Sequence, residues 1–180
     1  MSRSAPVPPP AGPTPRKAPT EARAIVRAYL TEQEERIWFG LMETYDALLH
    51  ELDTRLLAEH NLSLSAFEAL MHVTHTPGGA ISVSELAELV RLSPSQVSRI
   101  AIDLERKGLV ERQRSTTDSR STEVAITGAG RQQLQDAAPA YLSTIRAQLF
   151  DPLNDQDIKQ LTRIWNRIEA AGQSSLSGEV

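Results

Sequence analysis

The stretch SELAELVRLSPSQVSRIAIDLERKGLV, residues 84–110, decides the fold of this chain. Ser84 is placed to cap a first helix that continues through Val90. Residues 91–93 are expected to form a tight corner, and a second helix start follows directly after it. Two helices joined by such a corner form a helix-turn-helix.

The second helix of the pair has strong signals at both ends. Ser93 is a candidate N-cap, Pro94 occupies the first helical position, and Gln96 stands three residues after the cap, as in a capping box. Gly108 is expected to end the helix, with the following leucine folding back on it. The sequence thus predicts a well-defined helix between Ser93 and Gly108.

This second helix has two different faces. At 100° per residue, its apolar residues fall on one narrow stripe that should face the core: Val97, Ile100, Ala101 and Leu104. The opposite face carries Ser95, Arg99, Ile102 and Arg106, flanked by Gln96 and Ser98. Small hydroxyls, an amide and arginines near a helix N-terminus can enter a major groove and reach base edges. We predict base contacts from Ser95, Gln96, Ser98 and Arg99, and contacts to the DNA backbone from Ser93 and Arg106.

A predicted hairpin follows the helix pair. The segments LVERQ (109–113) and EVAIT (123–127) are short and rich in β-branched or alternating apolar residues, as strands are. Between them lies RSTTDSRST (114–122), a loop that contains no glycine and is longer than the two residues that a simple hairpin turn needs. Arg112 and Arg114, on the strand that leads into the loop, are candidate phosphate contacts.

The charge of the chain is unevenly distributed. The formal net charge is −4, yet residues 91–120 hold seven Lys/Arg against four Asp/Glu. A basic segment on an acidic protein is what a localised phosphate-binding surface requires. Duplex DNA is therefore the expected partner.

The composition argues against an enzyme. The chain of 180 residues contains no cysteine, which excludes disulfides, zinc-thiolate sites and thiol chemistry. Its four histidines are scattered, and no nucleophile stands in a recognisable catalytic motif. His72 and His75 have an i, i+3 spacing that could hold a metal, but a surface or core histidine pair is the simpler interpretation. We predict no catalysis, no metal and no cofactor.

The order of these elements resembles the MarR family of bacterial transcription regulators. The most specific matches are SELAELVRLSPSQVSR, the LERKGLVER run, and DSRS followed by ITGAG at 126–130, and the resemblance covers about residues 31–171. It implies a mainly α fold with a small β-hairpin wing, in which a winged helix-turn-helix is flanked by N- and C-terminal dimerisation helices. It also implies a homodimer that regulates transcription, most simply as a repressor, from a pseudo-palindromic operator.

The resemblance also assigns roles to single residues. Arg120 would enter the minor groove, and Asp118 would hold its guanidinium in place, as in the Asp-X-Arg pattern of the family. For Asp118, a turn former without a partner is the alternative. A small aromatic or phenolic ligand would lie in a cleft lined by residues of two helical regions: Trp38, Met42, Phe67 and Met71. Ordinary core packing of these four side chains is the alternative.

The rest of the chain is divided around the helix-turn-helix. Seven of the eleven prolines fall in the first 19 residues, which predicts a disordered, basic tail. No apolar run approaches the roughly 20 residues that span a bilayer, and no secretory signal begins the chain, so we expect a cytoplasmic protein. The expected parts are the tail (1–20), an N-terminal dimerisation helix region (21–62), the winged lobe (63–127), C-terminal dimerisation helices (128–172) and a flexible end (173–180).

A winged helix that binds protein rather than DNA is the main alternative, since a fold alone does not determine function. Such a module would not need Arg99 placed for the major groove and Arg120 placed for the minor groove of DNA. Salt dependence distinguishes the two classes, because binding to DNA weakens steeply as salt rises.

Overall fold

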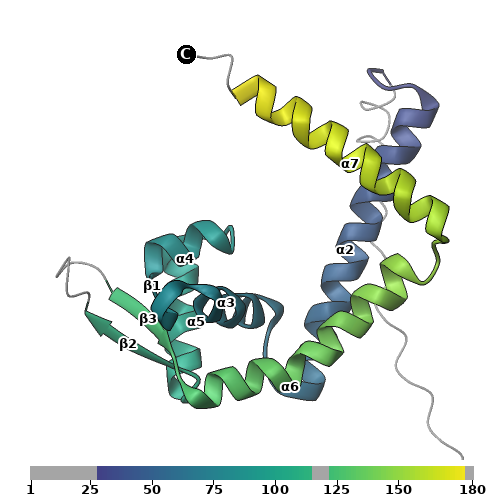
Figure 1. Ribbon diagram of the computed structural model, residues 1–180. Coiled ribbons are helices and arrows are strands. Elements are labelled where there is room, and N and C mark those ends of the chain that lie inside the picture. The colour runs from purple at the N-terminus through teal and green to yellow at the C-terminus, as the bar shows by residue number, and fades with distance from the viewer. Residues whose placement is uncertain (1–27, 115–121, 177–180) are drawn as a thin grey trace, which may run out of the picture. The chain divides into compact units, whose positions relative to one another are not determined.

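Residues 28–114 and 122–176 are described by a computed structural model of the chain (Figure 1). The predicted tail, Asp118 and Arg120 lie outside these ranges. The elements follow one another as α2 (Glu32–His60), α3 (Leu64–His75), the 3-10 turn η1 (Pro77–Gly79), β1 (Ala80–Ser82), α4 (Val83–Leu89), α5 (Pro94–Arg106), β2 (Val110–Arg114), β3 (Thr122–Ile126), α6 (Gly128–Ile145), the π-helical turn η2 (Arg146–Phe150) and α7 (Asp155–Leu176). The chain divides into two compact units, Met1–Ala47 and Leu48–Val180.

The first unit contains the start of α2. Thr31 caps this helix, because its backbone N–H donates to Glu34 Oε2 at 2.8 Å and its hydroxyl accepts from the Glu34 N–H at 3.3 Å. Several apolar side chains of the following turns are exposed: Ile37, Trp38, Leu41 and Tyr45. This apolar surface lies within residues 21–62, which the sequence predicts to be an N-terminal dimerisation helix region.

The second unit is built around an apolar core that all its central elements share. The predicted core stripe of α5 is confirmed: Val97, Ala101 and Leu104 are at most 1% exposed, and Ile100 is half-buried against them. They pack in one cluster with leucines and valines of α2, α3, α4 and the strands. The predicted helix-turn-helix is therefore α4, its corner and α5.

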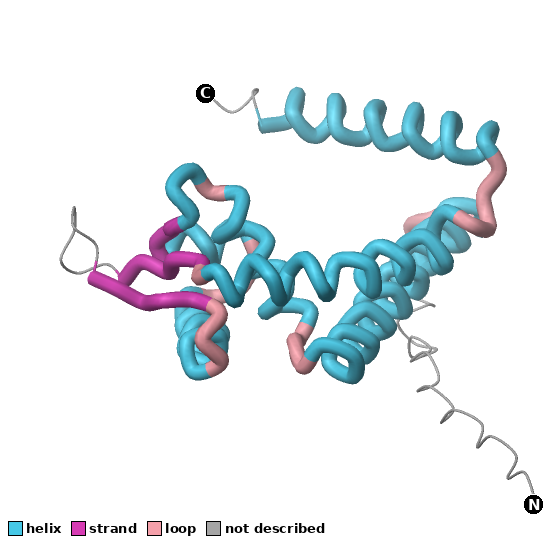
Figure 2. Tube along the Cα trace, turned by 60° about the horizontal axis from the view of Figure 1, so that its bottom comes forward, coloured by secondary structure: helices cyan, strands magenta, loops and turns pink. Residues whose placement is uncertain are grey.

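The strands form one antiparallel sheet in the order β1–β3–β2. Figure 2 shows them together at one edge of the helices of this unit. The predicted hairpin is confirmed as β2 and β3, with Val110 opposite Ile126 and Arg114 opposite Thr122. The strand β1 was not predicted, because three residues after a glycine pair are too few for an alternating pattern to be recognised.

The start of α4 differs from the prediction. Ser82, and not Ser84, is the N-cap, and its side chain accepts from the Glu85 N–H at 3.2 Å. The Glu85 carboxylate in return accepts from the Ser82 hydroxyl at 2.7 Å and from its N–H at 3.2 Å, and these bonds lower the pKa of Glu85. The reason is the spacing, since only Ser82 has an acidic residue three positions later.

Helix α6 begins in close contact with the turn that follows α5. The Thr127 hydroxyl accepts from the Gly130 N–H at 2.9 Å and donates to the Gly108 carbonyl at 2.8 Å. Gly130 is buried, and a Cβ atom there would collide with the Leu109 carbonyl oxygen and the Ile126 side chain. The ITGAG motif thus allows two backbone segments to touch.

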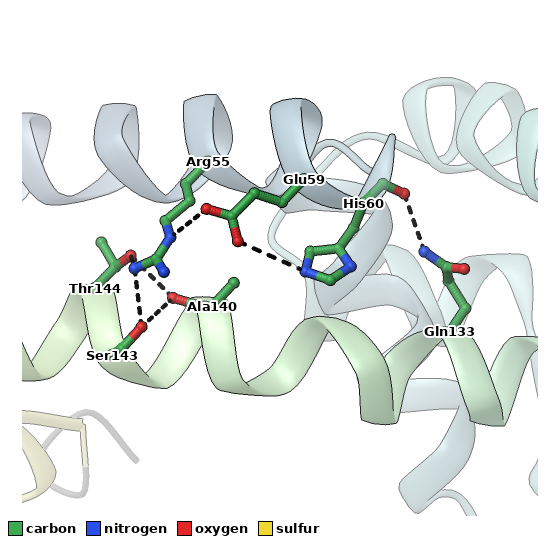
Figure 3. A network of polar contacts seen from close by, with 7 residues as sticks. All are labelled: Arg55, Glu59, His60, Gln133, Ala140, Ser143 and Thr144. Carbon is green, nitrogen blue, oxygen red and sulfur yellow. Dashed lines mark hydrogen bonds and ion pairs between the residues drawn. The ribbon is translucent and has the colours of Figure 1, made fainter. Parts of the chain in front are cut away.

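The C-terminal end of α2 is hydrogen-bonded to three other helices. Asp53 accepts from the first amide of α3 at 2.8 Å. Lys107, at the end of α5, donates to the Asn61 carbonyl at 2.9 Å. Gln133 of α6 donates to the His60 carbonyl at 3.0 Å (Figure 3). Asn61 ends the helix in the left-handed region, with φ of 53°, a conformation that asparagine adopts more readily than most residues.

Further contacts join the same part of α2 to α6. Arg55 donates to Ser143 Oγ at 2.9 Å and to Thr144 Oγ1 at 3.2 Å, and its Nε lies 2.8 Å from the Glu59 carboxylate (Figure 3).

None of the helices in the described ranges is both long enough and apolar enough to cross a bilayer.

Candidate nucleic-acid interface

The corner between α4 and α5 is tight and uses no glycine. Arg91 has a φ of 54°, which is uncommon for a residue with a side chain. The next amide, Leu92 N–H, donates to the Ala87 carbonyl at 3.0 Å and so satisfies the end of α4. This geometry fixes where α5 begins.

The start of α5 is the predicted capping box. The Ser93 hydroxyl accepts from the Gln96 N–H at 3.3 Å, and the Gln96 side-chain oxygen accepts from the Ser93 N–H at 3.0 Å and its hydroxyl at 2.8 Å. Pro94 fills the first helical position, where no N–H is needed. The side-chain oxygen of Gln96 is thus engaged inside the protein, and its amide nitrogen remains as a donor toward a base.

The face of α5 opposite the core is open. Ser95, Gln96, Arg99, Ile102 and Arg106 are exposed, and Ser98 is half-buried. The Ser95 hydroxyl lies 3.1 Å from that of Ser93, which groups two hydroxyls at the first turn. All six residues predicted to contact DNA from this helix and its cap, Ser93, Ser95, Gln96, Ser98, Arg99 and Arg106, lie on one element.

Ion pairs divide the basic residues of this region into two sets. Lys107 Nζ lies 2.9 Å from the Asp103 carboxylate, and Arg112 lies 3.5 Å from Glu105. Four arginines have no ion-pair partner among the residues that the structure describes: Arg91, Arg99, Arg106 and Arg114. The arginines of this second set can bind phosphate without first breaking an ion pair within the protein.

Arg112 is less accessible than the sequence suggested. It stands opposite Val124 on the core side of the hairpin, and its backbone N–H donates to Glu105 at 3.2 Å. Its Nε is buried without a hydrogen-bond partner in the described part of the chain. A phosphate contact from Arg112 would compete with Glu105, whereas Arg114, exposed at the end of β2, is free of that competition.

The residues expected to line a ligand cleft are distributed over both units. Phe67 is 2% exposed in the core, and its ring stacks on that of Tyr141 with centroids 4.7 Å apart. Met71 is half-buried against the same core. Trp38 and Met42 belong to the first unit, where Trp38 is exposed and Met42 half-buried. The structure thus shows Phe67 packed in the core, which is the alternative to a ligand-contacting role.

Glu68 and Tyr141 are two polar groups in this area to which the sequence assigned no functional role. Burial raises the pKa of the Glu68 carboxyl, and the nearby charge of His72 partly opposes this effect. Burial also raises the pKa of Tyr141, and the charge of Glu68 adds to that increase. The sequence signal was hidden, because a glutamate early in a helix is equally well explained by helix capping.

Glu68→Gln is expected to increase the free energy of unfolding at neutral pH. The raised pKa means that the charged form of Glu68 is less stable in the folded protein than in the unfolded chain. The free energy of unfolding of the wild type should therefore fall as pH rises from the ordinary pKa of 4.5 through the raised pKa of the folded protein. The gain from Glu68→Gln should therefore shrink on acidification. Urea unfolding across this pH range measures it, with exposed Glu88→Gln controlling for charge. A gain that stays constant with pH would contradict the assignment.

Gln96→Ala is expected to lower the free energy of unfolding by about 1 kcal/mol, the net value of a lost hydrogen bond. Gln96→Glu preserves the cap, as Glu85 does in α4, and should leave the melting temperature unchanged or higher. It should nevertheless weaken binding to DNA, because it adds a negative charge next to phosphates. Thermal melts and DNA titrations of both variants separate the two roles. Unchanged stability of Gln96→Ala would show that the cap matters little.

Comparisons with known proteins agree with this geometry. A model of the MarR family matches residues 60–121. The chain is 30% identical over 102 residues to the HTH-type transcriptional regulator YwaE of Bacillus subtilis, covering 57% of this chain and 58% of that protein. It is 27% identical over 120 residues to the transcriptional repressor MprA of Escherichia coli, covering 67% and 68%. The chain thus matches less than two thirds of the length of YwaE.

A solved structure extends the likeness to the whole fold. Sco3205, a MarR family transcriptional regulator from Streptomyces coelicolor in complex with DNA, is similar with a TM-score of 0.71 and 27% identity. The similarity covers 80% of this chain and 90% of that one. The mainly α fold with a small antiparallel sheet is therefore that of winged-helix regulators.

Proposed function

The chain belongs to the MarR family, and from this premise we propose that it regulates transcription by binding a specific duplex DNA sequence. The observation that carries the proposal is the open face of α5, on which Arg99 and Arg106 stand without an ion-pair partner in the described ranges. A helix with a polar N-terminal half and free arginines has the chemistry to contact base edges and phosphates. We propose that Arg120, in the predicted wing, enters the minor groove and that Asp118 positions its guanidinium.

We propose further that the protein acts as a homodimer and as a repressor. Exposed apolar side chains recur along α7 at helical spacing: Ile158, Ile164, Trp165 and Ile168. A shallow groove on this helix is lined by Ile164, Ile168 and Ala171 with Arg167. Such a face, together with the exposed apolar residues of early α2, favours association with a second copy. Light scattering should give a dimer at micromolar concentration, and a monomer would contradict the proposal.

We propose further that a small aromatic or phenolic effector binds to this protein and alters its affinity for DNA. The family resemblance suggests such an effector, and Phe67 and Tyr141 form a stacked aromatic pair in the second unit. Because Phe67 is buried, a ligand that contacted its ring would have to displace neighbouring side chains of the core. Titration with benzoate, followed by DNA affinity, tests this, and unchanged affinity at saturating benzoate would count against a simple aromatic acid.

Selection of bound duplexes from a random DNA pool tests the main proposal. We expect an inverted repeat whose half-sites are about one helical turn, roughly 10 base pairs, apart. The affinity for the selected duplex should fall steeply with salt, because phosphate contacts release counterions. A pool that shows no enrichment would instead favour a winged helix that binds protein.

Arg106→Ala is expected to weaken specific and non-specific DNA alike and to reduce the slope of log affinity against log salt by about one. The adjacent Lys107→Ala is the matched control for the salt slope, because the Lys107 ammonium is already 2.9 Å from the Asp103 carboxylate and donates to the Asn61 carbonyl. Its salt slope should stay near that of the wild type. Equal slopes for the two variants would show that the internal ion pair does not exclude phosphate contact.

A further inference from the structure

One side chain on the open face of α5 is apolar. Ile102 is 36% exposed, three residues after Arg99 and four before Arg106, so the three lie on the same side of the helix. The buried stripe of the helix runs along the opposite side. Ile102 is therefore an apolar side chain among the hydroxyl, amide and guanidinium groups of this face and the nearby Asp103–Lys107 ion pair.

Nothing within the described fold explains an isoleucine at this position. Ile102 belongs neither to the core cluster nor to the half-buried residues packed against it. A β-branched side chain at an exposed helix position loses rotamer freedom and is a poorer helix former than alanine. A smaller residue would lose the packing of the covered part of this side chain but gain helix propensity, so the net effect on stability should be small.

We propose that Ile102 contacts the C5 methyl group of a pyrimidine in the major groove, a specificity contact that rests on the proposed DNA-binding function. In unmodified DNA that pyrimidine is thymine, whose methyl group is the apolar feature of the groove floor. Unmethylated cytosine lacks this methyl group and presents its amino group in the same groove, which an aliphatic side chain would leave without a hydrogen-bond partner. 5-Methylcytosine offers the same methyl group and is the second possible source.

The spacing along α5 relates this contact to that of Arg99. Three residues advance the helix by about 4.5 Å, which exceeds the separation of roughly 3.4 Å between neighbouring base pairs. Ile102 is therefore expected to contact a base pair one or two steps from the one that Arg99 contacts. The position of the required thymine within each half-site is a consequence that the selected operator will show.

Substitution of thymine by deoxyuridine tests the inference, because it removes only the methyl group. With the full-length protein and the selected operator, one deoxyuridine in one half-site should weaken wild-type binding roughly fourfold, the value of one buried methyl group. Ile102→Ala should weaken binding to the thymine operator by at least as much. The deoxyuridine should then cost Ile102→Ala nothing further, so the two losses are not additive.

Three controls make the result specific. Ile102→Ala should melt close to the wild-type temperature, so that its weaker binding is not a folding defect. Arg106→Ala should show additive losses with the same deoxyuridine. Cytosine at that position should bind more weakly than deoxyuridine, and 5-methylcytosine should recover part of the loss.

Three results would overturn the inference. Additive losses for Ile102→Ala at every thymine of the half-site would show that Ile102 contacts no methyl group. Failure to select any operator would remove the proposed function itself and this inference with it. A selected operator that is insensitive to deoxyuridine leaves the proposed function intact and overturns only the contact.

Discussion

Gly130→Ala is expected to lower the free energy of unfolding of the second unit by about 3 kcal/mol, at the upper end of the range for overpacked cores. The added Cβ would collide with the backbone carbonyl oxygen of Leu109, which cannot rotate away as a side-chain end can. Relief requires α6 to move off the turn that ends α5. The Thr127 contact to the Gly108 carbonyl would weaken in the same movement.

Gly128→Ala is the matched control for this prediction. It lies two residues earlier in the same motif, in the first turn of α6, and a Cβ atom there meets nothing within 4 Å. Alanine is also the better helix former, so this variant should be as stable as the wild type or slightly more stable. Urea denaturation of the three proteins measures the difference. Coincident curves for the two variants would show that α6 can shift without cost.

Arg99→Ala is expected to weaken operator binding by roughly 1–3 kcal/mol, the range of a good bidentate base contact. Arg99 is exposed on the open face of α5, and its guanidinium has no carboxylate partner within the described residues. Its binding capacity is therefore fully available to DNA. Arg112→Ala should have a smaller effect on affinity, because Arg112 already pairs with Glu105.

Arg99→Lys should restore little of the lost specificity, since an ammonium cannot form the planar, bidentate contact of a guanidinium. Affinities for the selected operator and for a scrambled duplex at the same salt concentration separate base contact from charge. The prediction requires the operator to lose more than the scrambled duplex. An equal loss on both would assign Arg99 to the phosphate backbone.

The parts of this structure that were predicted from the sequence depend on neighbouring residues. Ser93, Gln96 and Gly108 set the ends of α5 through contacts spanning at most a few residues, and such signals are visible in a sequence. The sequence predicted two roles for Gln96, in the capping box and in base contact, and the structure shows that the box engages its side-chain oxygen. The same side chain can be predicted to have two roles, and only the geometry shows which of its atoms are still able to bind DNA.

The features that were missed depend on contacts between distant segments or on very short elements. Glu105 pairs with Arg112 across the turn between α5 and β2, and no local pattern indicates that pair. The strand β1 becomes a strand only because β3 lies beside it. The close approach behind Gly130 likewise requires α6 and the α5–β2 turn to be placed in space first.

The hydrogen bonds at the end of α2 have a mechanical consequence. Asn61 and His60 accept from α5 and α6 respectively, and Asp53 accepts from α3. Each bond contributes a net value of about 0.5–1.5 kcal/mol, so turning the last turn of α2 against its neighbours would break several of them at once. The end of α2 is therefore fixed against α3, α5 and α6, and we expect a rotation of this part of α2 to be transmitted to α5 through the Lys107–Asn61 contact.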